Sequence, residues 1–195
     1  MSPLTNLSAS VHQKLLNWAK VLNMSFNEIL ILYAIERFIY RMGKSPYTDN
    51  FILKGAVVFI AWQSAISRPT RDIDFLSYGD ASTDHVEKVI GEICKVKVEP
   101  DGLVFDHDSV RGAIIKEGAE YEGVRVQFNG FLGGAVIPMR VDIGFGDALL
   151  EKPKFISYPT LLEDTPTTKI RIYPPNRFFP KNFTLWWYWA SLTAG

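Results

Sequence analysis

The sequence lacks features that define several large classes of protein. One of its 195 residues is a cysteine, Cys94, which excludes an intrachain disulfide and predicts a reducing, cytoplasmic location. Lys and Arg number 21, and so do Asp and Glu, so the formal net charge is zero and no general positive field attracts nucleic acid. No apolar run reaches the roughly 20 residues that span a bilayer, and the N-terminus lacks the basic start of a signal peptide. We therefore expect a cytoplasmic protein with no membrane partner.

Hydrophobic residues make up 47% of the chain, which is enough for one globular core at this length. Their recurrence every three or four positions predicts two helices within residues 8–42, separated near Asn23, so residues 1–46 are expected to form N-terminal helices. Residues 47–173 are expected to contain two helices, at 56–63 and 82–96, and strands at 51–55, 72–76, 103–106, 111–118, 123–132 and 135–145. In the helix at 82–96, Asp84 and Glu87 have the spacing of a capping box. This order predicts an α/β (α+β) domain in which helices flank a mixed β-sheet.

Two carboxylates interrupt an otherwise apolar strand in the segment RPTRDIDFL. Asp72 and Asp74 are two residues apart, so both side chains point to the same face of a sheet. Like charges held this close repel each other, and a divalent cation with oxygen ligands would neutralise them. A solvent-exposed strand end would also accommodate the pair, and a DxD pair occurs at metal sites of some sugar transferases.

A glycine turn and a third aspartate add to this pattern. In LKGAV, Gly55 ends a strand and opens a helix, which can bring backbone N–H groups close to phosphate but also suits any tight strand-to-helix turn. In RVDIGFGD, Asp142 lies between two β-branched residues, so it could project to the side of the first pair or simply face water. The three features together are more specific than any one of them.

The segments LKGAV, RPTRDIDFL, YEGVRVQFNGFLGGAVIPMR and VDIGFGD resemble the AbiEii (abortive infection) nucleotidyltransferase toxins, within the polymerase-β-like nucleotidyltransferase superfamily. The resemblance covers about residues 51–173 and implies the nucleotidyltransferase fold for the core at 47–173. Two positions depart from the family pattern. Ala56 stands where a second glycine is usual, and Val57 stands where a hydroxyl residue is common.

The resemblance also implies a reaction. An acceptor hydroxyl would attack the α-phosphate of a nucleoside triphosphate (NTP) and release pyrophosphate, with Mg²⁺ or Mn²⁺ neutralising the charge. Asp72, Asp74 and Asp142 would be the catalytic residues and the metal ligands. The nucleotide-binding residues would be Lys54, Gly55, Ala56, Arg68 and Arg71. Asp147 would lie near the site, tRNA or another RNA would be the acceptor, and a cognate antitoxin would be the protein partner.

Residues 174–195 differ in character from the rest of the chain. They place three of the five tryptophans in the run WWYW. At this point members of the resembling family continue with a helix that contains Glu-Lys-Phe, and the lysine of that helix is expected to contact the nucleotide phosphates. Codons for Trp-Trp-Tyr-Trp-Ala, read from the last base of each preceding codon, encode Val-Val-Leu-Gly, and the same shift at residues 180–183 permits Glu-Lys-Phe. We therefore expect an out-of-frame tail after a frameshift near Pro174 or Pro175, which truncates the family's C-terminal helices. The alternative is a native aromatic tail used for packing or for a partner.

These features leave three functions open. The leading hypothesis is a metal-dependent nucleotidyltransferase toxin of a toxin–antitoxin system. The alternative is a truncated, catalytically inactive remnant that acts only as a binding module for antitoxin or nucleic acid, which the missing lysine favours. A small-molecule nucleotidyltransferase, such as those that modify antibiotics, would share the metal site and differ in its acceptor pocket. Retention of the three aspartates favours an enzyme, because paired carboxylates without a cation only repel.

Overall fold

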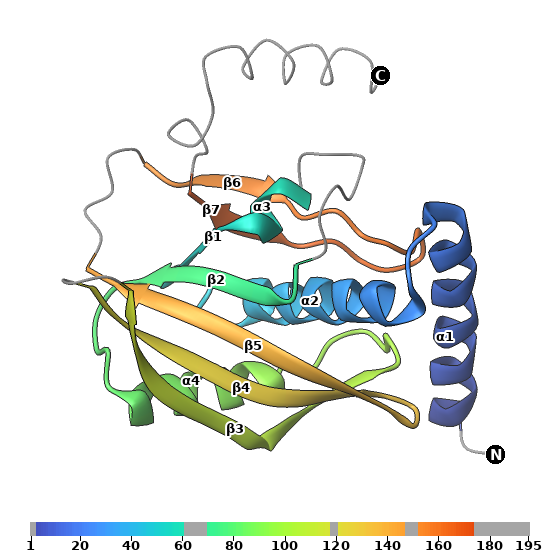
Figure 1. The fold of residues 1–195 in the computed structure, drawn as a ribbon, viewed down its shortest axis with the longest axis horizontal. Helices are drawn as coiled ribbons and strands as arrows, with labels where there is room; N and C mark the ends of the chain where they lie inside the picture. Colours follow the sequence, from blue (N-terminus) through green and yellow to red (C-terminus); the bar gives the residue numbers. More distant parts are fainter. Residues whose placement is uncertain (1–2, 61–69, 118–120, 147–151, 174–195) are drawn as a thin grey trace, which may run out of the picture.

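A computed structural model describes residues 3–60, 70–117, 121–146 and 152–173. Within these ranges the elements are α1 (Pro3–Leu22), α2 (Phe26–Lys44), β1 (Phe51–Lys54), α3 (Ala56–Ile60), β2 (Asp72–Ser77), α4 (Thr83–Cys94), β3 (Leu103–Glu117), β4 (Tyr121–Leu132), β5 (Ala135–Phe145), β6 (Lys154–Ser157) and β7 (Lys169–Ile172) (Figure 1). The tail expected to be out of frame, residues 174–195, lies outside the described residues, as do Arg68 and Asp147.

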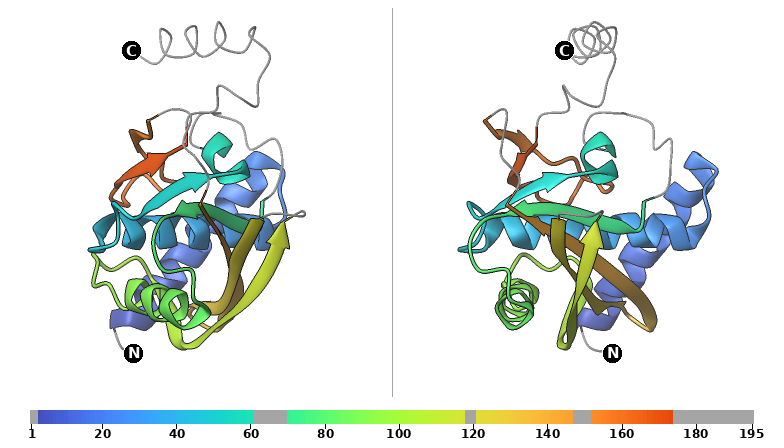
Figure 2. Two further views of the ribbon diagram at one scale, coloured as in Figure 1. Left: turned by 90° about the vertical axis from the view of Figure 1, so that its left-hand side faces the viewer. Right: turned by 60° about the vertical axis from the view of Figure 1, so that its left-hand side comes forward.

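The strands form one sheet in the order β3-β4-β5-β2-β1-β7-β6. β2 runs parallel to β5 and β1 runs parallel to β7, whereas the other neighbouring strands are antiparallel. The sheet twists, and its edge strands β3 and β6 lie at opposite ends (Figure 2). The predicted mixed sheet and α/β class are therefore confirmed. The segments expected as separate strands at 103–106 and 111–118 are one strand, β3, with a β-bulge between Asp106 and Arg111.

The hydrophobic core lies between α2, α4 and one face of the sheet. Phe38 of α2 packs against Phe105 of β3 and Phe128 of β4, with ring centroids 5.7 and 5.1 Å apart. Leu15 of α1 and Phe75 of β2 belong to the same buried cluster. The N-terminal helices and the sheet thus share one core, and the boundary expected at residue 46 separates segments of the chain that pack together.

Two predictions concerned the ends of the helices, and one of them is confirmed while the other is wrong. The break between α1 and α2 occurs as predicted, because Asn23 adopts a φ of 52° and Ser25 caps α2 in a capping box with Glu28. The capping box expected at Asp84 and Glu87 is wrong. Ser82 is the N-cap of α4, and the Glu87 carboxylate instead accepts a hydrogen bond from the backbone N–H of Gly112, at 2.5 Å.

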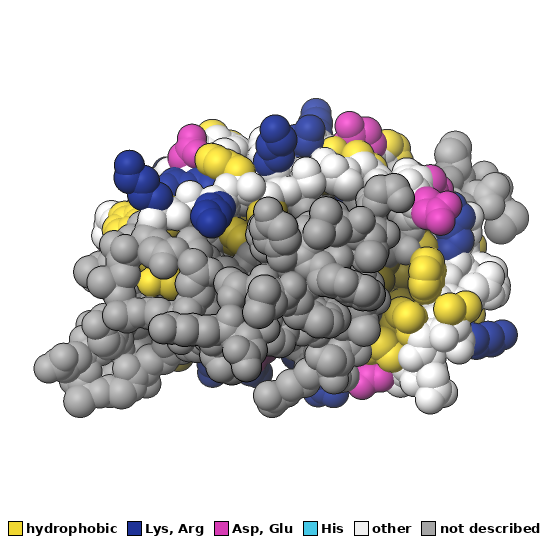
Figure 3. Space-filling view, turned by 90° about the horizontal axis from the view of Figure 1, so that it is seen from above, with side chains coloured by type: hydrophobic (Ala, Val, Ile, Leu, Met, Phe, Trp, Pro, Cys, Tyr) yellow, Lys and Arg dark blue, Asp and Glu magenta, His cyan; other side chains and the backbone are white. Residues whose placement is uncertain are grey.

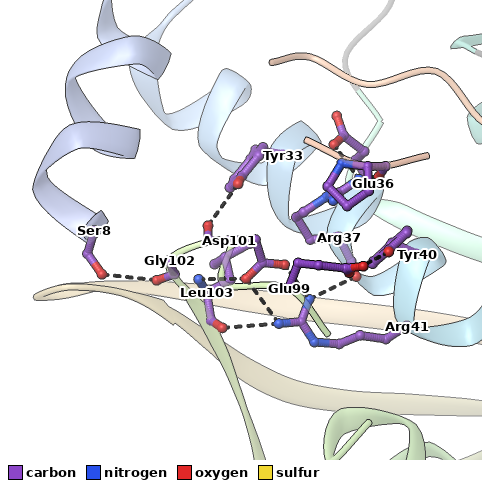
Figure 4. A network of polar contacts seen from close by, with 11 residues as sticks. Ser8, Tyr33, Glu36, Arg37, Tyr40, Arg41, Glu99, Asp101, Gly102 and Leu103 are labelled. Atoms are coloured by element: carbon purple, nitrogen blue, oxygen red, sulfur yellow. Dashed lines mark hydrogen bonds and ion pairs between the residues drawn. The ribbon is translucent and has the colours of Figure 1, made fainter. Parts of the chain in front are cut away.

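A buried polar network holds α2 to the segment that precedes β3 (Figure 4). The Arg41 guanidinium donates to both carboxylate oxygens of Asp101, at 2.7 and 3.1 Å, and the Tyr33 hydroxyl donates to the Asp101 carbonyl at 2.8 Å. Nearby, burial raises the pKa of Glu36 to about 7, although its ion pair with Arg37 acts in the opposite direction. Such networks fix one arrangement of the elements, because each buried charge requires its partner.

The outside of the molecule carries charges of both signs. Viewed from above, Lys and Arg side chains and Asp and Glu side chains both occur on the described surface (Figure 3). No helix in the described part of the chain is both long enough and apolar enough to cross a membrane.

Candidate active site

The predicted carboxylates lie on the sheet face that points away from the core. Along β2, Ile73 and Phe75 are buried in the core, while Asp72 and Asp74 alternate with them and are partly exposed on the opposite face. The spacing of two thus places both carboxylates on one face, as expected for a strand.

Strand pairing brings a third carboxylate and a lysine to the same place. Asp142 of β5 is the register partner of Asp74 in the parallel pair β2–β5, and Lys54 of β1 is the register partner of Asp74 on its other side. Arg125 of β4 is the register partner of Asp142. Lys54, Asp74, Asp142 and Arg125 therefore form one row across four adjacent strands, with two negative charges between two positive ones. We call these four residues the charged row.

Arg125 holds Asp142 in a two-point ion pair. Its Nε donates to Oδ1 at 2.8 Å and its Nη2 donates to Oδ2 at 2.6 Å. The Asp142 side chain is 10% exposed and that of Arg125 is 36% exposed, so water screens the contact only in part. The sequence did not predict Arg125 as a site residue, although it lies on the non-core face of a strand next to the predicted site.

A second arginine lies beside Asp72. Nη1 of Arg140, the register partner of Asp72 on β5, is 3.3 Å from Oδ1 and 3.5 Å from Oδ2. The two side chains are 41% and 38% exposed, so this pair is held loosely. The two arginines correct one inference from the sequence. The repulsion between neighbouring carboxylates does not by itself require a metal ion, because guanidinium groups already neutralise part of it.

Gly55 is required where it stands. Its φ is +71°, a left-handed conformation, and a Cβ at this position would lie 2.1 Å from Oδ2 of Asp74. The turn therefore packs directly against the carboxylate, while Gly55 and Ala56 themselves are exposed. The Lys54 ammonium lies over Gly144, whose Cβ would be 3.1 Å from Nζ. The sequence-predicted Lys54, Gly55 and Ala56 thus lie next to the carboxylates.

Arg71 lies elsewhere. It precedes β2 and is exposed. Hydrogen bonds from Ser25 lower the pKa of the Glu28 carboxyl, and the charge of Arg71 lowers it further, which shows that the guanidinium lies within electrostatic range of the start of α2. Arg68 lies outside the described residues.

The donor set of the three aspartates suits a divalent cation. Three carboxylates from two adjacent strands on one face supply the oxygen ligands that Mg²⁺ and Mn²⁺ prefer. Among the described residues, the ligand atoms of Asp106, His107 and Asp108 lie within 4.8 Å of one another, whereas Asp72, Asp74 and Asp142 do not form so close a group. The closer group lies at the bulge of β3, where Asp106 accepts the backbone N–H of Asp108 at 3.0 Å and thereby stabilises the bulge. Asp72, Asp74 and Asp142 stay the metal ligands that the sequence predicts, and the structure places them on one face of the sheet.

Gly55→Ala tests the contact between the turn and Asp74. The new methyl group would enter the Asp74 carboxylate, so we expect a loss of about 1 to 3 kcal/mol in unfolding free energy beyond the backbone cost, as in an overpacked site. Gly133→Ala is the matched control, because its φ is +58° and its Cβ would meet only Ser8 at 3.6 Å. Urea unfolding measures both variants, and equal losses would contradict the close packing of Gly55 on Asp74.

Two solved structures are similar to the chain at low identity. The crystal structure of JHP933 from Helicobacter pylori matches with 15% identity and a TM-score of 0.42, over 72% of this chain and 50% of that one. A second H. pylori protein, described as a candidate nucleotidyltransferase, matches with 16% identity and a TM-score of 0.42, over 76% of this chain and 54% of that one. The chain thus spans about half the length of these two proteins. No curated protein matches it.

A family model also matches most of the sequence. The family is described as "Nucleotidyl transferase AbiEii toxin, Type IV TA system", and the match runs over residues 37–181. This range is well over half of the chain and includes every strand of the sheet and the whole charged row. The chain belongs to the AbiEii family of nucleotidyltransferase toxins of type IV toxin–antitoxin systems.

Proposed function

We propose that the chain transfers a nucleoside monophosphate from an NTP to an acceptor hydroxyl. The observation that carries this proposal is the register pairing of Asp74 with Asp142, which gathers them with Asp72 on the non-core face beside the Gly55 turn. Family membership supports the same reaction class. Nucleotidyl transfer demands positioning and charge neutralisation more than covalent work by the protein, and a charged row on a rigid sheet suits that demand.

Each residue has a defined role in this proposal. Asp72, Asp74 and Asp142 would hold the Mg²⁺ or Mn²⁺, which when bound would supply charge neutralisation at the α-phosphate and make the acceptor hydroxyl more acidic. Asp142 lies at the side of the row away from Lys54 and accepts the proton of the acceptor hydroxyl. Lys54 neutralises the triphosphate, and the exposed backbone of Gly55 and Ala56 allows the phosphates to approach closely.

We extend the proposal to an acceptor and a protein partner. We assign the acceptor hydroxyl to an RNA end, such as that of tRNA, and we assign inhibition of the enzyme to a cognate antitoxin, as the description of a type IV toxin–antitoxin system implies. The exposed Lys169 of β7, which alternates with the core residues Ile170 and Ile172 and so lies on the non-core face, is placed to contact the phosphates of such an acceptor.

One observation favours the alternative of an inactive binding module. Arg125 and Arg140 already neutralise Asp142 and Asp72, so the three carboxylates can persist in a folded protein that binds no metal ion. The two functions differ in a direct assay.

Transfer of label tests the proposal. The chain is incubated with each α-labelled NTP, total cellular RNA and Mg²⁺, with EDTA in parallel, and Asp72→Asn is the comparison. We expect label to enter RNA from one preferred NTP, and we expect EDTA and the variant each to remove most of it, because both withdraw the charge neutralisation at the α-phosphate. Absence of transfer by the unaltered chain with every NTP would favour the binding module.

A further inference from the structure

Among the described side chains, Asp142 differs from the other two proposed metal ligands in its surroundings. It is buried, with 7% of its surface exposed, whereas Asp72 and Asp74 are partly exposed. Its ion pair with Arg125 uses both carboxylate oxygens at once, at 2.8 and 2.6 Å. The carboxylate that lies deepest in the candidate site is therefore already bound by a cation of the protein itself.

We infer that Arg125 is a positioning residue that occupies Asp142 as an internal cation and competes with the divalent ion for it. This inference rests on the proposed function, because both use Asp142 as a metal ligand. In the absence of the ion, the guanidinium holds the carboxylate in place and neutralises it. When the ion binds, Arg125 must release at least part of its two-point contact.

Two physical reasons indicate that Arg125 competes with the divalent ion for Asp142 and does not merely hold the carboxylate in place. A guanidinium and a divalent cation repel each other, so their joint presence on one carboxylate weakens the binding of the ion. In addition, the two nitrogens of the Arg125 fork contact both oxygens of the Asp142 carboxylate, which are the atoms that a divalent ion would use. The exposure of the Arg125 side chain, 36%, leaves it a route to swing into solvent once the ion has bound.

Arg140 does not share this role to the same degree. Its contacts with Asp72 are 3.3 and 3.5 Å long, and both side chains are about two-fifths exposed. Water screens that pair, so a divalent ion displaces it with little loss. The competition is therefore concentrated at the pair formed by Arg125 and Asp142.

The test is a titration of Mn²⁺, followed by the paramagnetic signal of the free ion, on the unaltered chain and on Arg125→Gln. We expect Arg125→Gln to bind Mn²⁺ at least threefold more tightly. We also expect its melting temperature to fall in EDTA, because Asp142 is then buried without its cation, and to rise on addition of Mn²⁺ by more than that of the unaltered chain. The melting data report on positioning without any use of activity.

Two further variants make the result specific. Arg111→Gln is the matched control. Arg111 lies on the same face of the sheet as Arg125, because its register partner Gln127 is two residues from Arg125 on β4. This variant removes the same charge and should leave the Mn²⁺ affinity nearly unchanged. Arg125→Lys keeps the charge and loses the fork, so it should give an intermediate affinity, and it replaces Arg125→Gln as the decisive variant if that protein does not fold. Unchanged or weaker binding by the decisive variant would overturn competition.

The two proposals can fail separately. Asp74→Asn is expected to weaken Mn²⁺ binding to the unaltered chain. If it does so while the Arg125 variants do not strengthen binding, the inference about Arg125 is wrong and the metal site stands. If the unaltered chain binds no Mn²⁺, or if Asp74→Asn leaves binding unchanged, the metal ligands of the proposed function are wrong and the competition falls with them.

Discussion

Asp74→Asn is expected to lower the rate of label transfer by at least about a hundredfold, the usual range for loss of one preorganised charged group at a transition state. Asp74 lies at the centre of the charged row, between its register partners Lys54 and Asp142, and it contacts the Gly55 turn. Asparagine keeps the shape of the side chain and removes its charge. The initial rate at saturating NTP and Mg²⁺ measures the effect.

Asp108→Asn is the matched control for this variant. Asp108 belongs to the group at the bulge of β3 that offers the other set of possible metal ligands. Its side chain is 86% exposed, so the substitution costs little stability. We expect it to keep most of the activity. A large loss in Asp108→Asn together with a small loss in Asp74→Asn would move the metal site from the sheet face to the bulge.

Much of the fold could be predicted because the spacing of the hydrophobic residues along the chain indicates which face of each helix or strand is buried. The two N-terminal helices, β1, β2, α4 and the long antiparallel strands all alternate or repeat clearly in the sequence. β6 and β7 could not be predicted, because each has four residues and β6 is largely exposed, which leaves too little periodicity to read. The capping box at Asp84 failed because α4 begins earlier, with Ser82 as its N-cap, and Glu87 instead has a tertiary partner, the N–H of Gly112, which no local pattern specifies.

The candidate site was predictable in part. The face shared by Asp72 and Asp74 follows from the period of a strand, but the parallel pairing of β2 with β5 depends on tertiary topology, so Arg140 could not be assigned to Asp72. Arg125 could have been found. The predicted strands 123–132 and 135–145 are separated only by Gly133 and Gly134, and a two-residue hairpin turn fixes the register of its strands, which sets Arg125 opposite Asp142.

Asp101→Ala is expected to lower the unfolding free energy by about 3 to 5 kcal/mol, the range for a broken buried ion pair. Arg41 and Asp101 are 5% and 4% exposed, and removal of the carboxylate leaves the guanidinium buried with, among the described residues, the carbonyls of Arg37 and Leu103 as its acceptors (Figure 4). The variant also removes the acceptor for the N–H of Leu103, at 3.0 Å. Urea unfolding at pH 7 measures the loss.

Lys14→Ala provides the comparison, because it breaks an ion pair of similar length in a different environment. Lys14 and Asp164 are 2.5 Å apart, but their side chains are 44% and 63% exposed, so the expected loss is below about 1 kcal/mol. The double variant Arg41→Met with Asp101→Ala should be more stable than Asp101→Ala alone, since it removes the unpaired charge as well. If Asp101→Ala lowered the unfolding free energy no more than Lys14→Ala, the buried pair would not hold α2 to the segment before β3. The packing of α2 under the sheet that carries the charged row would then depend on apolar contacts alone.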